Sequence, residues 1–346
     1  MKTPLLLCLA ISLSAPHDLT SKHEKGQVRR TSFSFEEERS MVEMSATVNG
    51  EEQPAMEGMS HIQTSSGSGL FVDSTTRVED SECMAFERVY EELEYNASLE
   101  VDNPFGEGMS EVPSFESELE GMTVRFTRDD GDFVAEFPEE DAGDEELLED
   151  LVGELPWDNF LPAGSVEDEA EWEIESETFF QTLDLGGDLS FEADEEGALS
   201  SAMASDNDGD ADYSGEVTAT LISVSEVDGR MMAKISLEVD ASKLEDNTES
   251  ARAQMEERGQ PDDAPEGALM PELESMEVEI AYEGEGTLMW DVEGGYLVSL
   301  EMELELEASQ TMEMFLEFGG QTMEIEQVMA FEGKHSIEVE VEVESN

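Results

Sequence analysis

Chemistry in this 346-residue chain would have to come first from carboxylates, and their most suggestive grouping is the segment 206–212, DNDGDAD. Calcium prefers oxygen ligands at alternate positions of such a loop. The EF-hand loop also needs glycine at its sixth position and glutamate at its twelfth, where a count from residue 206 finds Ala211 and Val217. The segment remains a candidate for weak calcium binding, with a plain acidic linker as the alternative; the four ligands would be Asp206, Asp208, Asp210 and Asp212.

Histidine and nucleophile chemistry has little support in the sequence. The four histidines, His17, His23, His61 and His335, lack the paired spacing of zinc sites, and His335 falls beside a predicted turn, where a solvated side chain is expected. No G-x-S-x-G, P-loop or dinucleotide-binding motif is present. Paired catalytic carboxylates cannot be recognised among 89 acids, so an enzyme remains an alternative to the non-enzymatic protein that we expect.

Sulfur ligands give a third possibility. Thioethers suit copper(I), and Met312-x-Met314 and Met231-Met232 are candidate pairs. In a strand, however, Met312 and Met314 share the parity of apolar neighbours, which favours packing, and a curved sheet lined with methionine could enclose an adaptable apolar pocket. Cys8 lies in the N-terminal apolar run, so Cys83 would be the one cysteine of an exported chain; we interpret it as a small strand residue without a disulfide.

The excess of acids limits the partners that this protein can have. There are 89 Asp and Glu against 16 Lys and Arg, a formal net charge of −73. Nucleic acid is not expected as a partner, because phosphate binding requires basic patches. Such a surface repels itself unless ions screen it. The composition therefore predicts adaptation to salt, with bound divalent cations as the alternative.

The N-terminus has the pattern of an export signal. A short basic start precedes an apolar run from Leu5 to Leu13 and the small residues Ser14 and Ala15, so residues 1–15 are predicted to be a signal peptide and 16–28 a polar spacer. Cys8 follows leucines inside the run, and lipid attachment is therefore not expected. No other stretch is long and apolar enough to span a membrane as a helix, which predicts a periplasmic or extracellular protein.

The rest of the chain divides into two halves that are rich in strand patterns. Residues 29–191 are predicted to form an N-terminal β half with helices at 144–155 and 176–183, and Ser66-Gly67-Ser68-Gly69 is interpreted as a turn or flexible loop. An acidic linker is expected at 192–212, and a C-terminal antiparallel β half at 213–346. Residues 244–271 are polar and predict an insertion that is loop or partly helical.

The C-terminal region has the clearest pattern. Apolar residues alternate with glutamates from Tyr296 to Ala308 and again from Ile337 to Val343. A strand places two such sets on opposite faces, whereas a helix would scatter them. The fold class is therefore mainly β, with long curved antiparallel sheets or a partly open barrel, glutamates toward solvent and the methionine and aliphatic side toward the core.

Three segments carry a family resemblance. They are Phe160–Val166 with Trp172, Leu185–Leu189, and Glu283–Thr287 with the following Trp290-Asp291 and Gly294–Leu297. Together they resemble motifs of a family of exported bacterial β-rich proteins of unknown function, common in planctomycete-like genomes. The chain departs from that pattern where Glu167-Asp168-Glu169 precedes the tryptophan. The resemblance implies export and β architecture, and no activity.

These observations favour an exported, acidic and non-enzymatic β scaffold. We expect it to bind a hydrophobic ligand or an envelope protein in a concavity lined with methionine and aliphatic residues. The alternative is a structural or surface protein whose acidic faces bind divalent cations.

Overall fold

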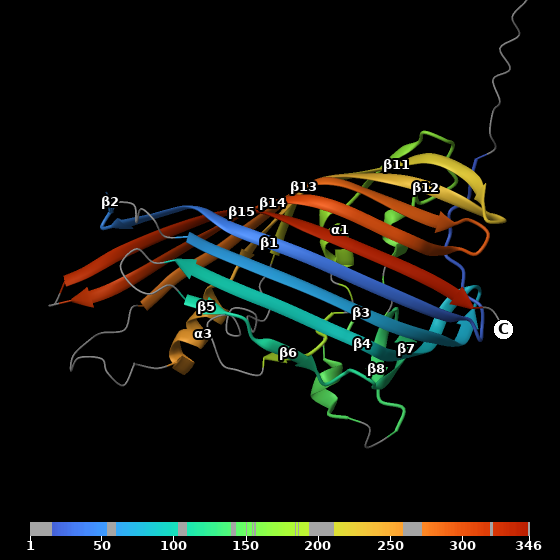
Figure 1. Ribbon diagram of the computed structural model, residues 1–346, viewed down its shortest axis with the longest axis horizontal. Helices are drawn as coiled ribbons and strands as arrows, with labels where there is room; N and C mark the ends of the chain where they lie inside the picture. The colour runs from blue at the N-terminus through green and yellow to red at the C-terminus, as the bar shows by residue number, and fades with distance from the viewer. Residues whose placement is uncertain are drawn as a thin grey trace, which may run out of the picture.

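The computed structural model describes residues 16–344 apart from 54–59, 103–108, 140–142, 150, 154, 156, 184, 186, 194–210, 259–271 and 319–320. The described chain forms one antiparallel sheet of 15 strands that is not closed (Figure 1). This confirms the predicted mainly β fold with a long curved antiparallel sheet. Its strand order is β10-β6-β4-β3-β1-β15-β14-β13-β12-β11-β9, while β2 pairs with β1, β5 and β7 pair with β4, and β8 pairs with β7.

The long strands run from 17 to 24 residues, and the remaining strands are short. The long strands are β1 (Val28–Val48), β3 (Ser60–Glu79), β4 (Glu82–Asp102), β11 (Ala211–Val227), β12 (Arg230–Asp246), β13 (Glu272–Asp291), β14 (Tyr296–Phe318) and β15 (Gln321–Glu344). The short ones are β2 (Glu51–Glu52), β5 (Met109–Glu111), β6 (Ser114–Ser117), β7 (Thr123–Asp129), β8 (Asp132–Glu136), β9 (Glu171–Ile174) and β10 (Phe191–Ala193). The helical segments are the 3-10 turns η1 (Glu145–Leu148) and η2 (Trp157–Phe160) and the helices α1 (Ser176–Leu183) and α3 (Thr248–Arg258).

The first and last long strands pair with each other from end to end of β1. The register of β1 and β15 runs from Val28 opposite Glu344 to Val48 opposite Ile325, with an irregularity between Met41 and Glu43. The parts of the chain on either side of the predicted linker therefore share one sheet. The linker itself, 192–212, lies mostly outside the described residues, and the predicted domain boundaries stay a prediction.

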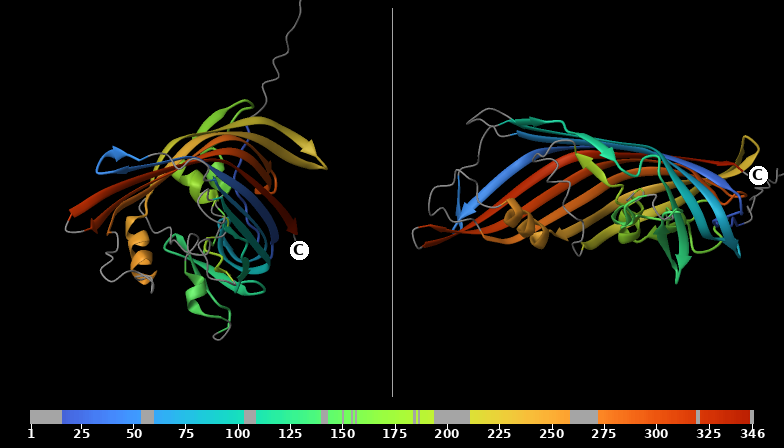
Figure 2. Two further views of the ribbon diagram at one scale, coloured as in Figure 1. Left: turned by 60° about the vertical axis from the view of Figure 1, so that its left-hand side comes forward. Right: turned by 90° about the horizontal axis from the view of Figure 1, so that it is seen from below.

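The sheet is an arch (Figure 2). Its two faces differ in their chemistry. Between Glu301 and Ala308 every glutamate is exposed and every apolar residue is buried, as the alternating sequence predicts. On the outer, convex face the strand register sets carboxylates side by side, because Glu285 lies opposite Glu303 and Glu301 opposite Glu338. Like charges in this position destabilise a sheet, so this face is compatible only with solvent and ions.

The inner, concave face is filled at one end of the arch, which we call the packed end. It includes the start of β1, the start of β14 and the end of β15, at the right of Figure 1. Segments between β8 and β10 cover it, and their buried Trp157, Phe160 and Phe179 join the core with Leu300 and Val339. The opposite end of the strands, which we call the open end, carries α3 beside β13.

Arg88 of β4 fixes the covering segment to the sheet. Its side chain is 1% exposed, donates to both carboxylate oxygens of Asp73 at 2.8 and 2.9 Å, and donates to the carbonyls of Val152 and Gly153, each at 2.8 Å. A buried pair of this kind needs all of its hydrogen bonds satisfied, and the two carbonyls complete the set. The predicted helix 144–155 is therefore wrong beyond η1, because the backbone of Val152 and Gly153 is held by Arg88 instead of continuing helical hydrogen bonds.

Two further local predictions are settled by the structure. Ser66–Gly69 is no turn but the middle of β3, where the rings of Phe35 and Phe33 lie over Gly67 and Gly69, so closely that a Cβ would come within 2.4 Å of each ring. The helix predicted at 176–183 is confirmed as α1, and α3 accounts for the helical part of the predicted insertion 244–271. Residues 259–271 lie outside the described part.

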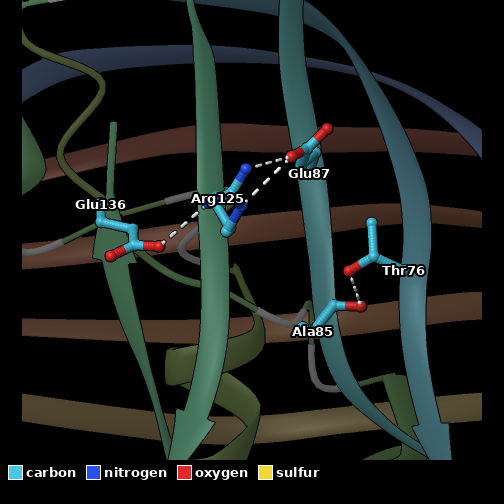
Figure 3. A network of polar contacts seen from close by, with 5 residues as sticks. All are labelled: Thr76, Ala85, Glu87, Arg125 and Glu136. Atoms are coloured by element: carbon cyan, nitrogen blue, oxygen red, sulfur yellow. Dashed lines mark hydrogen bonds and ion pairs between the residues drawn. The ribbon is translucent and has the colours of Figure 1, made fainter. Parts of the chain in front are cut away.

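Basic residues on the convex side form ion pairs with acids on neighbouring strands. Arg125 of β7 lies between Glu87 of β4, at 2.8 Å, and Glu136 of β8, at 3.4 Å (Figure 3). Arg125 is 38% exposed, so each pair adds little to stability. These scattered pairs leave most of the acidic surface without a cationic partner in its strand neighbours.

Salt should raise the thermal stability of this protein steeply. Screening shortens the range of repulsion from about 10 Å at 0.1 M salt to about 3 Å at 1 M salt. At the higher concentration the carboxylate rows therefore repel one another much less. We expect the midpoint of thermal unfolding to rise between 0.1 and about 1 M potassium chloride and then to level off. The variant Glu303→Lys, which relieves a row that includes Glu285, should melt higher in low salt and respond less to salt. Melting curves that do not change with salt would refute the repulsion argument.

Candidate functional site

A group of charged and polar side chains interrupts the apolar concave face halfway along the arch. Strand alternation places it there: Phe33 and Phe35 of β1 point inward, and so do the next residues of that parity, Glu37 and Arg39. On β15 the same alternation makes His335 point inward, because it lies two residues before the inward-facing Ile337. His335 pairs with Glu37 across the two strands. Glu37, Arg39, His335 and the neighbouring Tyr282 of β13 are called the boundary cluster below.

The contacts within the boundary cluster centre on the Glu37 carboxylate. Its Oε2 lies 3.1 Å from His335 Nδ1, and its Oε1 lies 2.6 Å from Arg39 Nε. The side chains are largely shielded, with 12% of Glu37 and of His335 and 25% of Arg39 exposed. Arg39 Nε and His335 Nδ1 are buried at ion-pair distance, yet neither makes a well-directed hydrogen bond. His335 is therefore not the solvated residue beside a turn that the sequence predicted.

The charges of the cluster stabilise each other against burial. Burial acts to raise the pKa of the Glu37 carboxyl, but His335 and Arg39 together outweigh it and hold that pKa below its ordinary value. Burial likewise opposes the charge on Arg39, and Glu37 outweighs burial and raises the Arg39 pKa. Burial, with Glu37 acting in the same direction, raises the pKa of the Tyr282 hydroxyl. The cluster is thus an ionised pair with a neutral phenol beside it.

Aromatic rings surround the boundary cluster. The His335 ring stacks on Phe35 with centroids 6.1 Å apart and lies 5.6 Å from Tyr282. Phe180 of α1 reaches Tyr282 at 5.7 Å, and the Lys243 ammonium lies 6.0 Å from the Phe180 ring centroid. Lys243 itself pairs with Glu245 at 2.5 Å on the concave side of β12. Helix α1 is therefore the covering element beside the cluster, and the filled core ends there.

Beyond the cluster, toward the open end, the concave face becomes more exposed and stays largely apolar, with Gln310 and Gln327 at inward positions among its methionines. Ala308 and the residues before it on β14 are buried, whereas Met312, Met314 and Leu316 are partly exposed. The register brings together methionines from four neighbouring strands, and none of them belongs to the buried core clusters. This methionine band consists of Met41, Met44, Met276, Met312, Met314, Met323 and Met329, with Val48, Leu316 and Ile325 among them.

Two hollows lie near the packed end. One is a cavity of about 50 Å³ beneath Gly153 and Tyr296, which holds little more than water. The other is an open hollow of about 390 Å³ among loops, lined by Arg128 and Asp158. His23 and Cys83 line both, a proximity that their sequence separation hides, and Cys83 is buried in β4 as a strand residue. The concave face is the stronger candidate, because it combines paired charges with an extended apolar surface.

The predicted calcium ligands are only partly within the described chain. Asp206, Asp208 and Asp210 lie outside it, and Asp212 is exposed on β11 opposite Leu244. Among the described residues, no three histidine, cysteine or acidic side chains converge as metal ligands would. Calcium binding at 206–212 stays a prediction. Met312 and Met314 lie on the inward side of β14, as their parity predicts, and Met232 is buried.

The comparisons with known proteins add no relative. No protein-family model matches the chain, and no curated protein matches it. The resemblance to exported bacterial β-rich proteins therefore stays a prediction. Within the described part of the chain, none of the helices has the length and apolar composition required to cross a membrane.

Replacing Glu37 should destabilise the fold in a pH-dependent way. Glu37→Gln leaves Arg39 and His335 without their anion, so we expect a loss of about 1–3 kcal/mol in unfolding free energy at pH 7. Because the folded-state pKa of Glu37 lies below its ordinary value near 4.5, its contribution is fully present above that pH. The contribution is lost as pH falls through the lowered folded-state pKa.

The matched control is Glu303→Gln, which removes a carboxylate from the convex face of β14. It relieves repulsion and should leave the unfolding temperature unchanged or raise it. Denaturant titrations of both variants at several pH values provide the comparison. Equal effects of the two substitutions, or a Glu37 effect that grows as the pH is lowered below 4, would contradict the assignment of the ion pair.

Proposed function

We propose that this protein is an exported, non-enzymatic scaffold that binds an apolar ligand on the methionine band. One observation carries the proposal: the alternation of β1, β13, β14 and β15 continues past the packed core, interrupted only at Gln310 and Gln327 on β14 and β15, onto a largely apolar surface that nothing in the described chain fully covers. A contiguous apolar surface that remains partly exposed marks a binding site more often than a packing fault.

The residue types of the band support a ligand with an adaptable, chain-like shape. Methionine is unbranched and polarisable, and it fits irregular apolar partners without a fixed pocket shape. From Met41 to Val48 the band extends roughly 23 Å at about 3.3 Å per residue. It also continues across the strands to Met276, so an extended chain would contact several strands at once. An envelope protein that inserts an apolar segment is the other occupant, and the test below distinguishes the two.

A second candidate function follows from the convex face. Its carboxylates stand opposite one another, as in the pairs Glu301–Glu338 and Glu307–Glu332, which favours a layer of bound cations. Titration of calcium by calorimetry addresses this candidate. Saturable heats of calcium binding that Glu301→Gln weakens would support a cation site. Heats that disappear in high potassium chloride would show that calcium only screens the surface charge.

The apolar-ligand proposal predicts saturable binding of an uncharged dye. N-phenylnaphthylamine should gain fluorescence with the full-length protein in high salt and reach saturation. The double variant Met312→Gln with Met329→Gln should weaken the dye affinity by about tenfold, because each loses part of a methionine contact worth up to about 1.5–3 kcal/mol when fully buried.

The matched control is Val328→Gln, which changes the neighbouring residue on the opposite face of β15. Its dye affinity should equal that of the wild type. Absence of saturable binding, or equal losses in the control and the double variant, would reject a small apolar ligand. If an added envelope protein covers the methionine band and the dye then no longer binds, the surface would be assigned to that protein.

A further inference from the structure

The concave face differs from the rest of this acidic protein in its charge. Near the packed end Asp73 and Arg88 neutralise each other. In the middle the inward charges along β1, β12 and β15 come as the pair Glu37–Arg39 with His335 and the pair Glu245–Lys243. In a chain with a net charge of −73, each of these inward acids therefore has a basic partner.

Arg39 has donors to spare in this arrangement. Its Nε faces Glu37, and among the described residues no acceptor receives a hydrogen bond from its two terminal amino groups. The carboxylate of the cluster, Glu37, already has Arg39 as a cationic neighbour, and the nearby Glu245 of β12 has Lys243. The two terminal amino groups are not among the buried atoms that lack a partner, so they remain accessible to solvent on the concave face and can donate to an added group. An added anion would satisfy them, whereas an added cation would find no free carboxylate here.

The position of Arg39 relative to the methionine band matches an amphiphile. Arg39 precedes Met41 by one inward step on β1, about 6.6 Å along the strand. The roughly 23 Å from Met41 to Val48 equals an extended chain of about 18 methylenes, each advancing about 1.25 Å. A headgroup at the cluster would thus place its chain on the band, while α1 blocks the way toward the packed core.

We propose that the boundary cluster binds the anionic headgroup of a single-chain amphiphile, a carboxylate or a phosphate monoester, through the guanidinium fork of Arg39. The fork matches the geometry of both anions. This inference rests on the proposed function, because the apolar chain occupies the methionine band. Lys243 lies on β12, separated from β1 by three strands, and is already paired with Glu245, so Arg39 supplies the positive charge for the headgroup.

The test compares an acid with its neutral ester. Parinaric acid and its methyl ester, two fluorescent probes with the same chain, are titrated into the full-length protein at pH 8 in 1 M potassium chloride. We expect the wild type to bind the acid about tenfold more tightly than the ester. In Arg39→Gln this preference should disappear through a loss of acid affinity alone, and Arg39→Lys, which keeps the charge without the fork, should restore part of it.

Arg125→Gln is the control, because it removes the same charge from the convex side. It should leave both affinities unchanged, and thermal melts establish that each variant is folded. Displacement of the bound acid by hexadecanoate and by hexadecyl phosphate identifies the preferred anion. Equal affinities for acid and ester, or a preference that survives in Arg39→Gln, would overturn the headgroup assignment while leaving the apolar site intact. Failure of both probes to bind would reject the proposed function itself.

Discussion

Repulsion between carboxylates on neighbouring strands is the constraint on which the rest of this structure depends. Glu285, Glu303, Glu301 and Glu338 stand side by side on the convex face, and no rearrangement within a regular sheet can separate them. That face must look onto solvent and ions. Every apolar contact that stabilises the fold has therefore to be made on the concave face, by the sheet's own side chains and by the segments between β8 and β10.

The concave face is longer than the elements that cover it. Strands of up to 24 residues extend well past α1, and the apolar alternation extends with them. The consequence is a surface with three parts: a packed core, the boundary cluster, and the methionine band. The ion pair of Glu37 and Arg39 is costly to bury, and it is found where the core ends and an anionic headgroup could complete its hydrogen bonds. The proposed ligand would bring charge and apolar surface together at this point.

Much of this arrangement could be predicted from the sequence, because period-two alternation survives in long strands. The glutamate rows of β14 and β15, their inward partners and helix α1 follow from local pattern alone. The helix expected at 144–155 failed because Arg88, distant in sequence, takes the carbonyls of Val152 and Gly153. The glycines of Ser66–Gly69 have the composition of a turn, and only the rings of Phe33 and Phe35 across the strand pair explain their place in β3.

The candidate site was predicted only in part. A concavity lined with methionine follows from the parity of Met312 and Met314, but its extent depends on where α1 and its neighbours end, which no local pattern specifies. Glu37 and Arg39 lie in an acidic run that resembles a solvated segment. Continuing the alternation from Phe33 and Phe35 would have placed both inside, and the same rule applied back from Ile337 would have placed His335 beside them.

The most direct test of the account is the oxidation rate of each methionine, measured by peptide mass spectrometry after brief treatment with hydrogen peroxide, with and without hexadecanoate. Met312 and Met329 of the methionine band should oxidise faster than Met302, which is 2% exposed on the same sheet face, and hexadecanoate should slow their oxidation without affecting exposed sites elsewhere. Oxidation of the band that is as slow as that of Met302, or that hexadecanoate leaves unchanged, would contradict a ligand surface on the concave face.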